Sequence, residues 1–467
     1  MLFNSVEFLI FFPAVCLVYY LLKGNRWRVP FLLLASYYFY MNWKPIYALL
    51  ILTSTVLTYV CGLMVEKHAD NKPLKKTFLI ISLILNFSIL FVFKYYNFIN
   101  DSVFSLLEWA GIRWTVPNLD LLLPVGISFY TFQAVGYSID VYRNTIKAER
   151  DFITYALFVS FFPQLVAGPI ERAKNLLPQF HQEHVFDYSR TVEGLRMMLW
   201  GYFMKSCVAD TVATYVDTIY NNVSDYNGPS LIVATLLFAF QIYCDFGGYS
   251  LIARGAAKVM GFNLMENFHR PYLSLSVKEF WKRWHISLSS WFMDYVYIPL
   301  GGNRVKYARH LTNLFITFLV SGIWHGANWT FVLWGAWHGA FIIIDNILRR
   351  IGIMPNQEKW WSKTLSIAIV FVVASFGWIF FRANNVQDAF YIIGKFFTPE
   401  GEAFFPKLQD LALVLLLVAK DIKDELGLNL NGMHSRHWYV RYACYYLLIG
   451  LTIIHLGTPQ QFIYFQF

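Results

Sequence analysis

The chain has 467 residues, of which 57% are hydrophobic and only 14% are charged, and its formal net charge is +9. This composition excludes a sizeable soluble domain, because apolar runs that approach or exceed the length of a membrane span recur along the sequence. The Lys and Arg residues stand mainly in short loops, where they signal orientation and contact phospholipid rather than nucleic acid. A β-barrel is disfavoured because the runs are continuous rather than alternating. We therefore predict an all-α polytopic membrane protein whose surroundings are the lipid bilayer and which binds no nucleic acid.

The N-terminal half is a series of apolar runs separated by short polar connections. The runs expected to form helices are 8–22, 31–41, 45–65, 78–93, 119–141 and 152–166. The first run lacks a preceding basic region and a small-residue cleavage site, so we interpret it as a retained helix rather than a signal peptide. The polar stretch AGPIERAKNLLPQFHQEH follows the last of them and contains Pro169 and Pro178. We expect that stretch to be interfacial or re-entrant.

The C-terminal half repeats this pattern around a polar interruption. The run 230–242 leads into YCDFGGYSLIARG, where Asp245 and Arg254 either pair with other groups and hold helices together or line a polar cavity. Further apolar runs cover 311–323, 331–347, 364–381, 411–418 and 442–454, and the uncharged aromatic stretch TPQQFIYFQF after them could pack at the interface. Hydropathy therefore predicts one integral membrane domain over residues 1–467 with about ten or eleven transmembrane helices.

The least hydrophobic part of this domain runs from residue 263 to residue 310. We predict one helix over 277–291, with Val277, Trp281, Trp284, Leu288 and Trp291 on one face. An adjacent polar stripe consists of Lys278, Lys282, His285 and Ser289. Such a helix lies at an interface or lines a cavity with one wet side.

The motifs of soluble enzymes are absent from the sequence. We find no GxSxG elbow, HExxH pair, Walker A loop or GxGxxG turn. The five cysteines stand far apart without a CxxC pair, so we expect neither a disulfide framework nor a metal site. Histidines at membrane depth remain as candidates, because ionisable side chains there are costly. A neutral imidazole can take a proton from a hydroxyl and return it to a leaving group near neutral pH.

Three histidines lie between residues 279 and 339. His325 stands in WHGA at the end of an apolar run, between glycines that permit a bend; it is either a base or bonded to a backbone carbonyl between helices. His285 is either hydrated at an interface or part of a site. His338 follows His325 by thirteen residues, a spacing that on one continuous helix rotates it by roughly 140° from His325. We interpret His338 as structural or as a support of the site.

At these histidines the sequence resembles the membrane-bound O-acyltransferase (MBOAT) family, in particular its AlgI-like bacterial branch. The matching motifs are PVGISFYTFQAVGYSIDVYR, FFPQLVAGPI, DFGGYS, FWKRWHISLSSWFMDYVYIPLGGNR, SGIWHGANWTFVLWGAWHG and GWIFFRA. They cover most of the chain, and the two long motifs make residues 279–339 the core of the expected active site. DFGGYS is often followed by an acidic residue in this branch, whereas here Leu251 follows, which puts in doubt an acidic role at that point.

The resemblance implies a fold of about 11 transmembrane helices with re-entrant or interfacial helices around a central tunnel. It implies that His325 is the catalytic base and His285 the second catalytic position. The residues expected to line or support the tunnel are Trp284, Ser289, Trp324, Asn328, His338 and Asp245. No metal and no resident cofactor is expected.

The implied enzyme is an O-acyltransferase. It would move an acetyl group from a cytoplasmic thioester donor, acetyl-CoA, across a bacterial cell (inner) membrane onto an extracellular or periplasmic polysaccharide, as in alginate acetylation. An SGNH-type acetyltransferase on the outer face is the expected partner. One alternative is DltB-like transfer of D-alanine from an acyl carrier protein to teichoic acid. Another is a non-enzymatic transporter, against which the lack of an inverted repeat counts.

Overall fold

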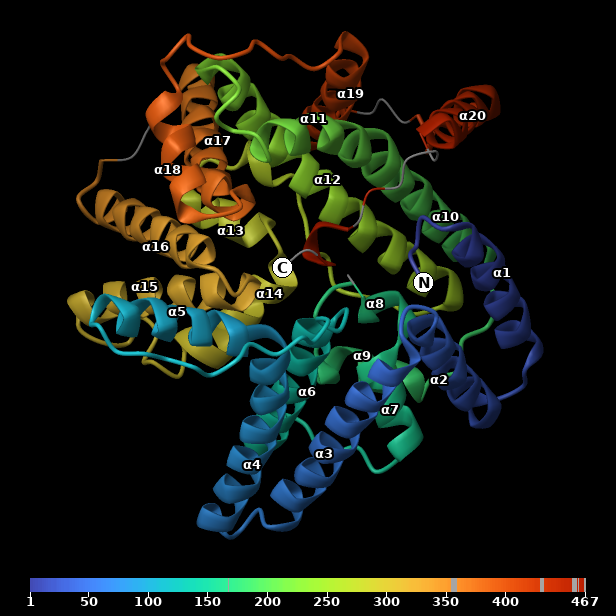
Figure 1. The fold of residues 1–467 in the computed structure, drawn as a ribbon. Coiled ribbons are helices and arrows are strands. Elements are labelled where there is room, and N and C mark those ends of the chain that lie inside the picture. Colours follow the sequence, from blue (N-terminus) through green and yellow to red (C-terminus); the bar gives the residue numbers. More distant parts are fainter. Residues whose placement is uncertain (167, 354–358, 429–431, 456–459, 461, 466–467) are drawn as a thin grey trace. The chain divides into compact units, whose positions relative to one another are not determined.

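The protein is helical in the computed structural model, which describes residues 1–166, 168–353, 359–428, 432–455, 460 and 462–465 (Figure 1). No strand occurs within these ranges. Five of their helical segments are long and apolar enough to cross a membrane, namely Pro45–Lys67, Lys72–Trp109, Gly228–Met260, Trp329–Arg350 and Trp360–Arg382. The predicted all-α polytopic membrane class is confirmed. The expected number of about 11 spans and the central tunnel stay predictions.

The chain divides into two compact units. Unit 1 consists of Met1–Leu195 and Ala253–Met265, and unit 2 consists of Arg196–Ile252 and Glu266–Phe467. The helices α10 (Tyr188–Tyr202) and α12 (Gly228–Met260) contribute residues to both units. The core predicted over residues 279–339 belongs entirely to unit 2. The prediction of one domain over 1–467 stays a prediction.

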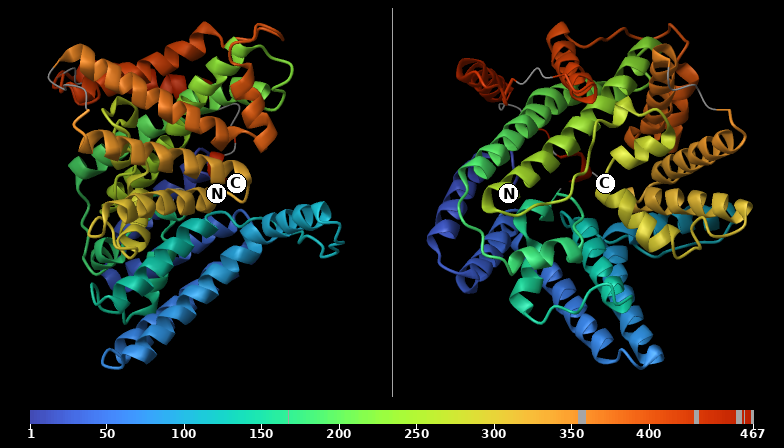
Figure 2. Two further views of the ribbon diagram at one scale, coloured as in Figure 1. Left: turned by 90° about the vertical axis from the view of Figure 1, so that its left-hand side faces the viewer. Right: turned by 180° about the vertical axis from the view of Figure 1, so that it is seen from behind.

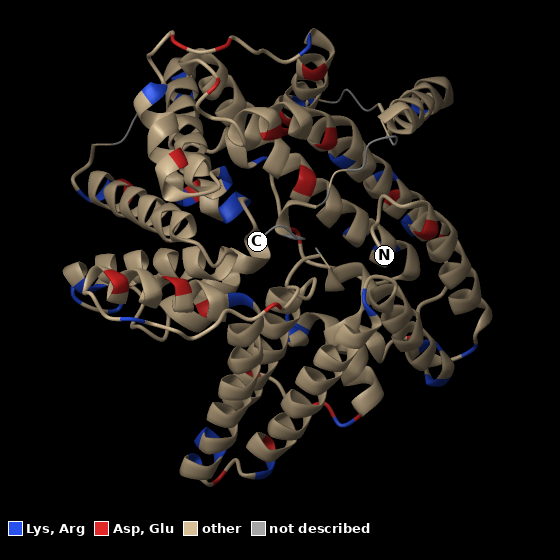
Figure 3. Ribbon diagram, in the orientation of Figure 1, with Lys and Arg blue, Asp and Glu red and all other residues tan. Residues whose placement is uncertain are grey.

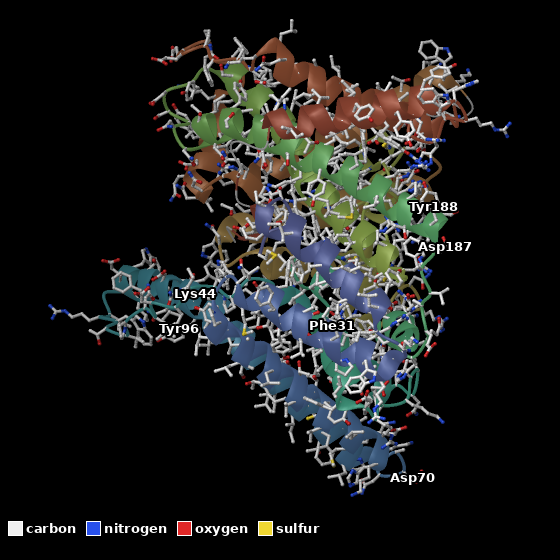
Figure 4. The ribbon with its side chains drawn as sticks, turned by 90° about the vertical axis from the view of Figure 1, so that its right-hand side faces the viewer. Phe31, Lys44, Asp70, Tyr96, Asp187 and Tyr188 are labelled. Carbon is white, nitrogen blue, oxygen red and sulfur yellow. The ribbon has the colours of Figure 1, made fainter. Side chains whose placement is uncertain are left out.

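Unit 1 is built around a long helical hairpin. Its helices are α1 (Val6–Leu21), α2 (Asn25–Met41), α3 (Ala48–Lys67), α4 (Lys72–Leu90), α5 (Tyr96–Trp109), α6 (Ile127–Tyr142), α7 (Phe152–Ser160), α8 (Phe162–Leu165) and α9 (Ala173–Phe180). Helices α3 and α4 run side by side (Figure 1, Figure 2), and Figure 4 shows Asp70 at the tip of their hairpin. Ser54 Oγ donates to Asn86 Oδ1 at 2.5 Å, and the Ser82 and Ser138 hydroxyls lie 2.9 Å apart. Small polar side chains thus join α3, α4 and α6, as is common between membrane helices.

The charges of this hairpin gather at its tip (Figure 3). Residues 48–65 of α3 and 77–90 of α4 carry no Asp, Glu, Lys or Arg, whereas the connection between them carries Glu66, Lys67, Asp70, Lys72, Lys75 and Lys76. Charged side chains are costly in hydrocarbon and are therefore expected at the ends of spanning helices. The charge pattern therefore supports a hairpin whose two helices span the membrane and whose charged tip lies at one membrane surface.

Unit 2 holds the remaining helices. They are α11 (Asp210–Tyr220), α13 (Val277–Arg283), α14 (Ile286–Phe292), α15 (Tyr307–His325), α16 (Trp329–Arg350), α17 (Trp360–Arg382), α18 (Val386–Lys395), α19 (Leu408–Glu425) and α20 (Trp438–His455). Helices α15 and α16 form a hairpin (Figure 1) in which Gly322 and Gly335 face each other. A Cβ at Gly335 would lie 2.6 Å from Phe318 O, so only glycine permits this approach of the two backbones.

The single helix predicted over 277–291 is wrong. The helix α13 ends at Arg283, and α14 begins at Ile286 after a sharp break at Trp284 and His285. The sequence is compatible with a continuous amphipathic helix, but contacts with a distant segment hold the backbone in another conformation. This break places His285 at a turn instead of on a polar helix face.

Candidate active site

His285 occupies the break between α13 and α14. Its φ of 42° is left-handed, a conformation that residues with a side chain rarely adopt. The Ile286 N–H donates to Asn267 O and the His269 N–H donates to Arg283 O, both at 2.9 Å. The segment 267–269 therefore pairs with backbone groups that the end of one helix and the start of the next would otherwise leave unsatisfied.

The side chain of Asn267 also holds the break. Ser287 Oγ donates to Asn267 Oδ1 at 2.6 Å, and Asn267 Nδ2 donates to Ser250 Oγ at 3.1 Å. All three side chains are buried. Because Ser250 ends the DFGGYS motif, this chain of hydrogen bonds connects that motif to the backbone beside His285.

The imidazole of His285 is enclosed by aromatic rings. It is 1% exposed, and its centroid lies 4.5 Å from that of Phe246 in an edge-to-face arrangement. The interpretation of His285 as a hydrated interfacial residue is therefore wrong. Burial lowers the pKa of His285 from 6.5 to about 3, so that the ring is neutral at pH 7.

His325 is the last residue of α15, where the chain turns towards α16. A Cβ on Gly326 would overlap the ring of Phe331, so glycine is required for this turn. The ring of His325 lies 4.8 Å from that of Trp334 and 5.3 Å from that of Phe381. The partial negative charge at the end of a helix stabilises a cation there, which favours an imidazole that gains a proton during a reaction.

Two aromatic rings contact both histidines. The ring of Trp324 lies 5.0 Å from His325 and 6.4 Å from His285. The ring of Tyr464 lies 5.8 Å from His325 and 6.4 Å from His285. The two histidine motifs, forty residues apart in the sequence, thus converge on shared neighbours in unit 2.

Tyr464 belongs to the stretch that could pack at the interface according to the sequence. Its neighbours Phe462 and Ile463 are instead buried, 1% and 2% exposed. The Ile463 N–H donates to Asp245 Oδ2 at 2.6 Å. The interfacial expectation is wrong for these residues, because a buried carboxylate of α12 binds the backbone of the segment.

Asp245 also forms a buried ion pair. Its Oδ1 lies 2.6 Å from Lys205 Nζ. The sequence left two interpretations of Asp245 open, namely pairing with other groups or lining a polar cavity. The contacts support the pairing interpretation. Asp245 reaches the histidines through the Tyr464 segment and not by a described contact of its own.

His338 lies in the interior of α16 among indole rings. Its centroid is 4.9 Å from that of Trp281, 5.0 Å from that of Trp334 and 6.1 Å from that of Trp378. Within the described ranges, neither ring nitrogen has a hydrogen-bond partner. His325 and His338 stand on separate helices, so the rotation of roughly 140° calculated for one continuous helix does not apply. The interpretation of His338 as structural agrees with its enclosed position.

The other predicted positions support helix ends. Trp284 is 1% exposed and packs 4.8 Å from Trp378, while Ser289 Oγ donates to Trp284 O at 3.1 Å. Asn328 caps α16 by accepting the Thr330 N–H at 3.0 Å. In the described part of the chain, no group of three His, Cys, Asp or Glu residues is placed to hold a metal ion.

Comparison with known proteins places this site in a family. Residues 145–385, which include both histidine motifs, match the model of the membrane-bound O-acyltransferase (MBOAT) family. The chain belongs to the MBOAT family. It is 40% identical to "Probable alginate O-acetylase AlgI" of Pseudomonas aeruginosa over 85% of this chain and 75% of that protein.

Further MBOAT relatives differ in the activity that their names state. "Peptidoglycan O-acetyltransferase" of Helicobacter pylori is 31% identical and covers 100% of this chain and 98% of its own length. "Teichoic acid D-alanyltransferase" of Streptococcus thermophilus is 29% identical over 56% of this chain and 68% of its own length. The protein is thus a multi-pass membrane O-acyltransferase, which excludes the reading as a non-enzymatic transporter.

The MBOAT motifs alone did not reveal three residues that shape the site. Asn267 carries no signal in the sequence, because an asparagine between two helices is ordinary. Tyr464 lies far along the chain from both histidine motifs. Lys205 did carry a signal that the sequence interpretation left unused, since it is a lysine within the largely apolar stretch GYFMKSCVA.

Proposed function

We propose that this MBOAT enzyme transfers acetyl groups from a cytoplasmic thioester, acetyl-CoA, for O-acetylation of a polysaccharide outside the cytoplasm of a bacterium. The observation that carries the proposal is the convergence of His285 and His325 on the rings of Trp324 and Tyr464. The names of the alginate and peptidoglycan relatives support acetate as the acyl group and a glycan as the acceptor.

His325 acts as the general base in this proposal. Its neutral imidazole takes the proton of the attacking hydroxyl while the hydroxyl oxygen bonds to the thioester carbonyl carbon. The tetrahedral intermediate then collapses, the carbon–sulfur bond breaks, and the imidazolium returns the proton to the departing thiolate. A positioned base contributes about 10² to 10⁴ in rate.

His285 orients the reactants or donates a hydrogen bond to developing negative charge. Its position supports this role, because the ring is neutral and is fixed by the break between α13 and α14. A neutral imidazole carries an N–H that can stabilise an oxyanion without adding a charge to an apolar site. The roles of His325 and His285 are therefore different, although both are histidines.

The path of the acetyl group requires a partner. We expect donor entry from the cytoplasmic face of the bacterial inner membrane and release of the acyl group towards the periplasm or the exterior. An SGNH-type acetyltransferase on the outer face would then complete transfer to the polysaccharide. Alginate-type acetylation is favoured by identity, whereas the full-length match to a peptidoglycan enzyme favours peptidoglycan as a second acceptor.

D-Alanine transfer from an acyl carrier protein to teichoic acid is the remaining alternative. The relative of that name matches only 56% of this chain, at 29% identity. The two acyl groups give different products under mild alkaline hydrolysis, since one releases acetate and the other releases D-alanine. Analysis of the released acid therefore separates the two functions.

The test measures ester-linked acetate and D-alanine in cell-envelope polymers. A bacterium that lacks its own copy receives the wild-type chain, His325→Ala or, as a matched control, His455→Ala, whose imidazole Nδ1 lies 2.8 Å from Leu451 O on α20. We expect acetate with wild type and control, and a loss of about 100-fold or more with His325→Ala at equal membrane content. Unchanged acetate in His325→Ala refutes the assigned base, and D-alanine in place of acetate refutes the proposed acyl group.

A further inference from the structure

A buried group of three charged side chains lies in unit 2 and takes no part in the proposed reaction. Lys205 Nζ lies 2.7 Å from Asp210 Oδ1 and 2.6 Å from Asp245 Oδ1. The three residues are between 1% and 3% exposed. We call this group the Lys205 cluster. Burying charges is costly, so a cluster of this kind requires close pairing and further hydrogen bonds.

The backbone around Lys205 departs from regular α-helix. Residues Phe203–Ala209 form a π-helical turn between α10 and α11. Such a turn inserts an extra residue into a helix and is frequent at functional sites. The turn ends directly before Asp210, so that Lys205 and Asp210 reach the same point beside Asp245 of α12.

The Lys205 cluster binds the backbone of the segment that carries Tyr464. Lys205 Nζ donates to Gln460 O at 3.2 Å, and Ile463 N–H donates to Asp245 Oδ2 at 2.6 Å. Asp210 accepts a backbone hydrogen bond from Gln460 as well. Two carboxylates face one ammonium in this cluster, and the backbone N–H groups of the segment supply the remaining donors that a buried carboxylate requires.

The segment in turn places one ring against the two histidines. Tyr464 follows Ile463 directly, and its ring contacts those of His325 and His285. Aromatic packing also holds the segment, with the ring of Phe462 4.6 Å from that of Tyr249 and the ring of Tyr464 4.7 Å from that of Phe246. Ordering an irregular segment costs conformational entropy, which charge-assisted hydrogen bonds can offset.

We propose that Lys205, Asp210 and Asp245 are positioning residues that fix the segment around Ile463, so that Tyr464 completes the wall of the histidine site. The proposal rests on the proposed function only through its activity measurement. It predicts that losing the contact between Asp245 and Ile463 displaces Tyr464 and slows transfer, although none of the three charged residues reaches the reacting atoms.

The first test measures the segment itself and needs no substrate. Hydrogen–deuterium exchange in detergent follows the Ile463 amide in wild type, Asp245→Ala and Asp210→Ala. Either substitution leaves one Lys205–carboxylate pair, so neither leaves the lysine without a counter-charge. We expect exchange at Ile463 to speed up about tenfold or more in Asp245→Ala, as for loss of a bond to a charged acceptor, and by less in Asp210→Ala, which of the bonds to the segment loses only the one to Gln460. Equal exchange in wild type and Asp245→Ala overturns the proposal.

The second test separates positioning from general stability. Acetyl transfer is measured for Asp245→Ala, Tyr464→Ala and the double variant, with Asp245→Asn as the conservative variant that keeps an oxygen acceptor for Ile463. We expect a loss of about tenfold in Asp245→Ala, partial rescue in Asp245→Asn, and no further loss when Asp245→Ala is added to Tyr464→Ala. Losses that multiply, or full activity in Asp245→Ala, overturn the proposal. An inactive wild type instead contradicts the proposed function, and the exchange result still decides the positioning role.

Discussion

The tripeptide Trp-His-Gly occurs twice in unit 2, at residues 324–326 and at residues 337–339, with different surroundings. His325 closes a helix, borders the ring of Tyr464 and is followed by a glycine turn. His338 lies within a helix, with three indole rings around it and, in the described ranges, no hydrogen-bond partner for either nitrogen. The same tripeptide therefore occurs in two chemically distinct environments.

The difference shows that helix position decides what an imidazole can do. A proton gained by a ring in a helix interior would create a buried charge, which is costly unless another group pairs with it. A ring at a helix C-terminus lies in a field that favours a proton. The comparison supports the proposal that His325 takes part in the chemistry and that His338 serves packing.

The largest expected effect separates the second catalytic position from the packed histidine. His285→Ala should lower acetyl transfer by about 100-fold, because it removes a neutral N–H donor that shares the rings of Trp324 and Tyr464 with His325. His338→Leu is similar in volume and removes the unsatisfied nitrogens, so its rate should stay within about threefold of wild type. Initial rates in membrane vesicles, normalised to the protein content, provide the measurement. Greater loss in His338→Leu than in His285→Ala contradicts the comparison.

A pair of glycine substitutions tests the same difference through the backbone. Gly326→Ala inserts a Cβ into the ring of Phe331 and should disturb the turn at His325, with a loss of activity of about tenfold or more. Gly377→Ala places a Cβ 2.5 Å from His338 Nε2, so it should instead destabilise the fold by about 1–3 kcal/mol. Transfer rates and thermal midpoints of both variants are compared. Equal loss of activity at unchanged midpoints would count against separate roles.

A matched pair of buried asparagines sharpens the account of His285. Asn267→Ala removes the side chain that binds Ser287, and we expect transfer to fall about tenfold as the break between α13 and α14 loosens. Asn313 is equally buried and donates to Leu300 O at 3.1 Å. Asn313→Ala should therefore lower stability with a smaller effect on the rate. The measurement is the transfer rate of each variant, corrected for its folded fraction. A wild-type rate in Asn267→Ala would contradict the role of Asn267 in positioning His285.

Stability against pH provides the smallest effect. Burial lowers the pKa of His285, so below pH 6.5 the unfolded chain binds a proton there that the folded chain does not. The unfolded state then binds more protons, and stability falls as the pH drops below 6.5, by about 1 kcal/mol near pH 5.5. His285→Asn cannot titrate and tolerates the left-handed backbone. Between pH 7.5 and 5.5, which lie about one unit on either side of the histidine pKa in the unfolded chain, the thermal midpoint of this variant should drop less than that of wild type. An equal drop in the two proteins would contradict a buried neutral ring at His285.

Sequence reasoning recovered the helical membrane class and both histidine motifs, because apolar runs and dense local motifs are properties of contiguous residues. It failed at the break at His285, because the amphipathic pattern of residues 277–291 contains no information about hydrogen bonds to residues outside it. The bonds from Asn267 determine the backbone conformation there. It also left Tyr464 at the interface. The buried carboxylate that binds its neighbour Ile463 lies on α12, and a hydropathy pattern carries no information about such a partner.

The measurement that bears most directly on the central claim is a single-turnover assay with labelled acetyl-CoA in vesicles that contain the chain, its SGNH-type partner and the polysaccharide acceptor. We predict that His325→Ala lowers the rate of label transfer by about 100-fold or more, while the amount of inserted protein stays that of wild type. Transfer by His325→Ala at the wild-type rate would contradict the assignment of His325 as the base.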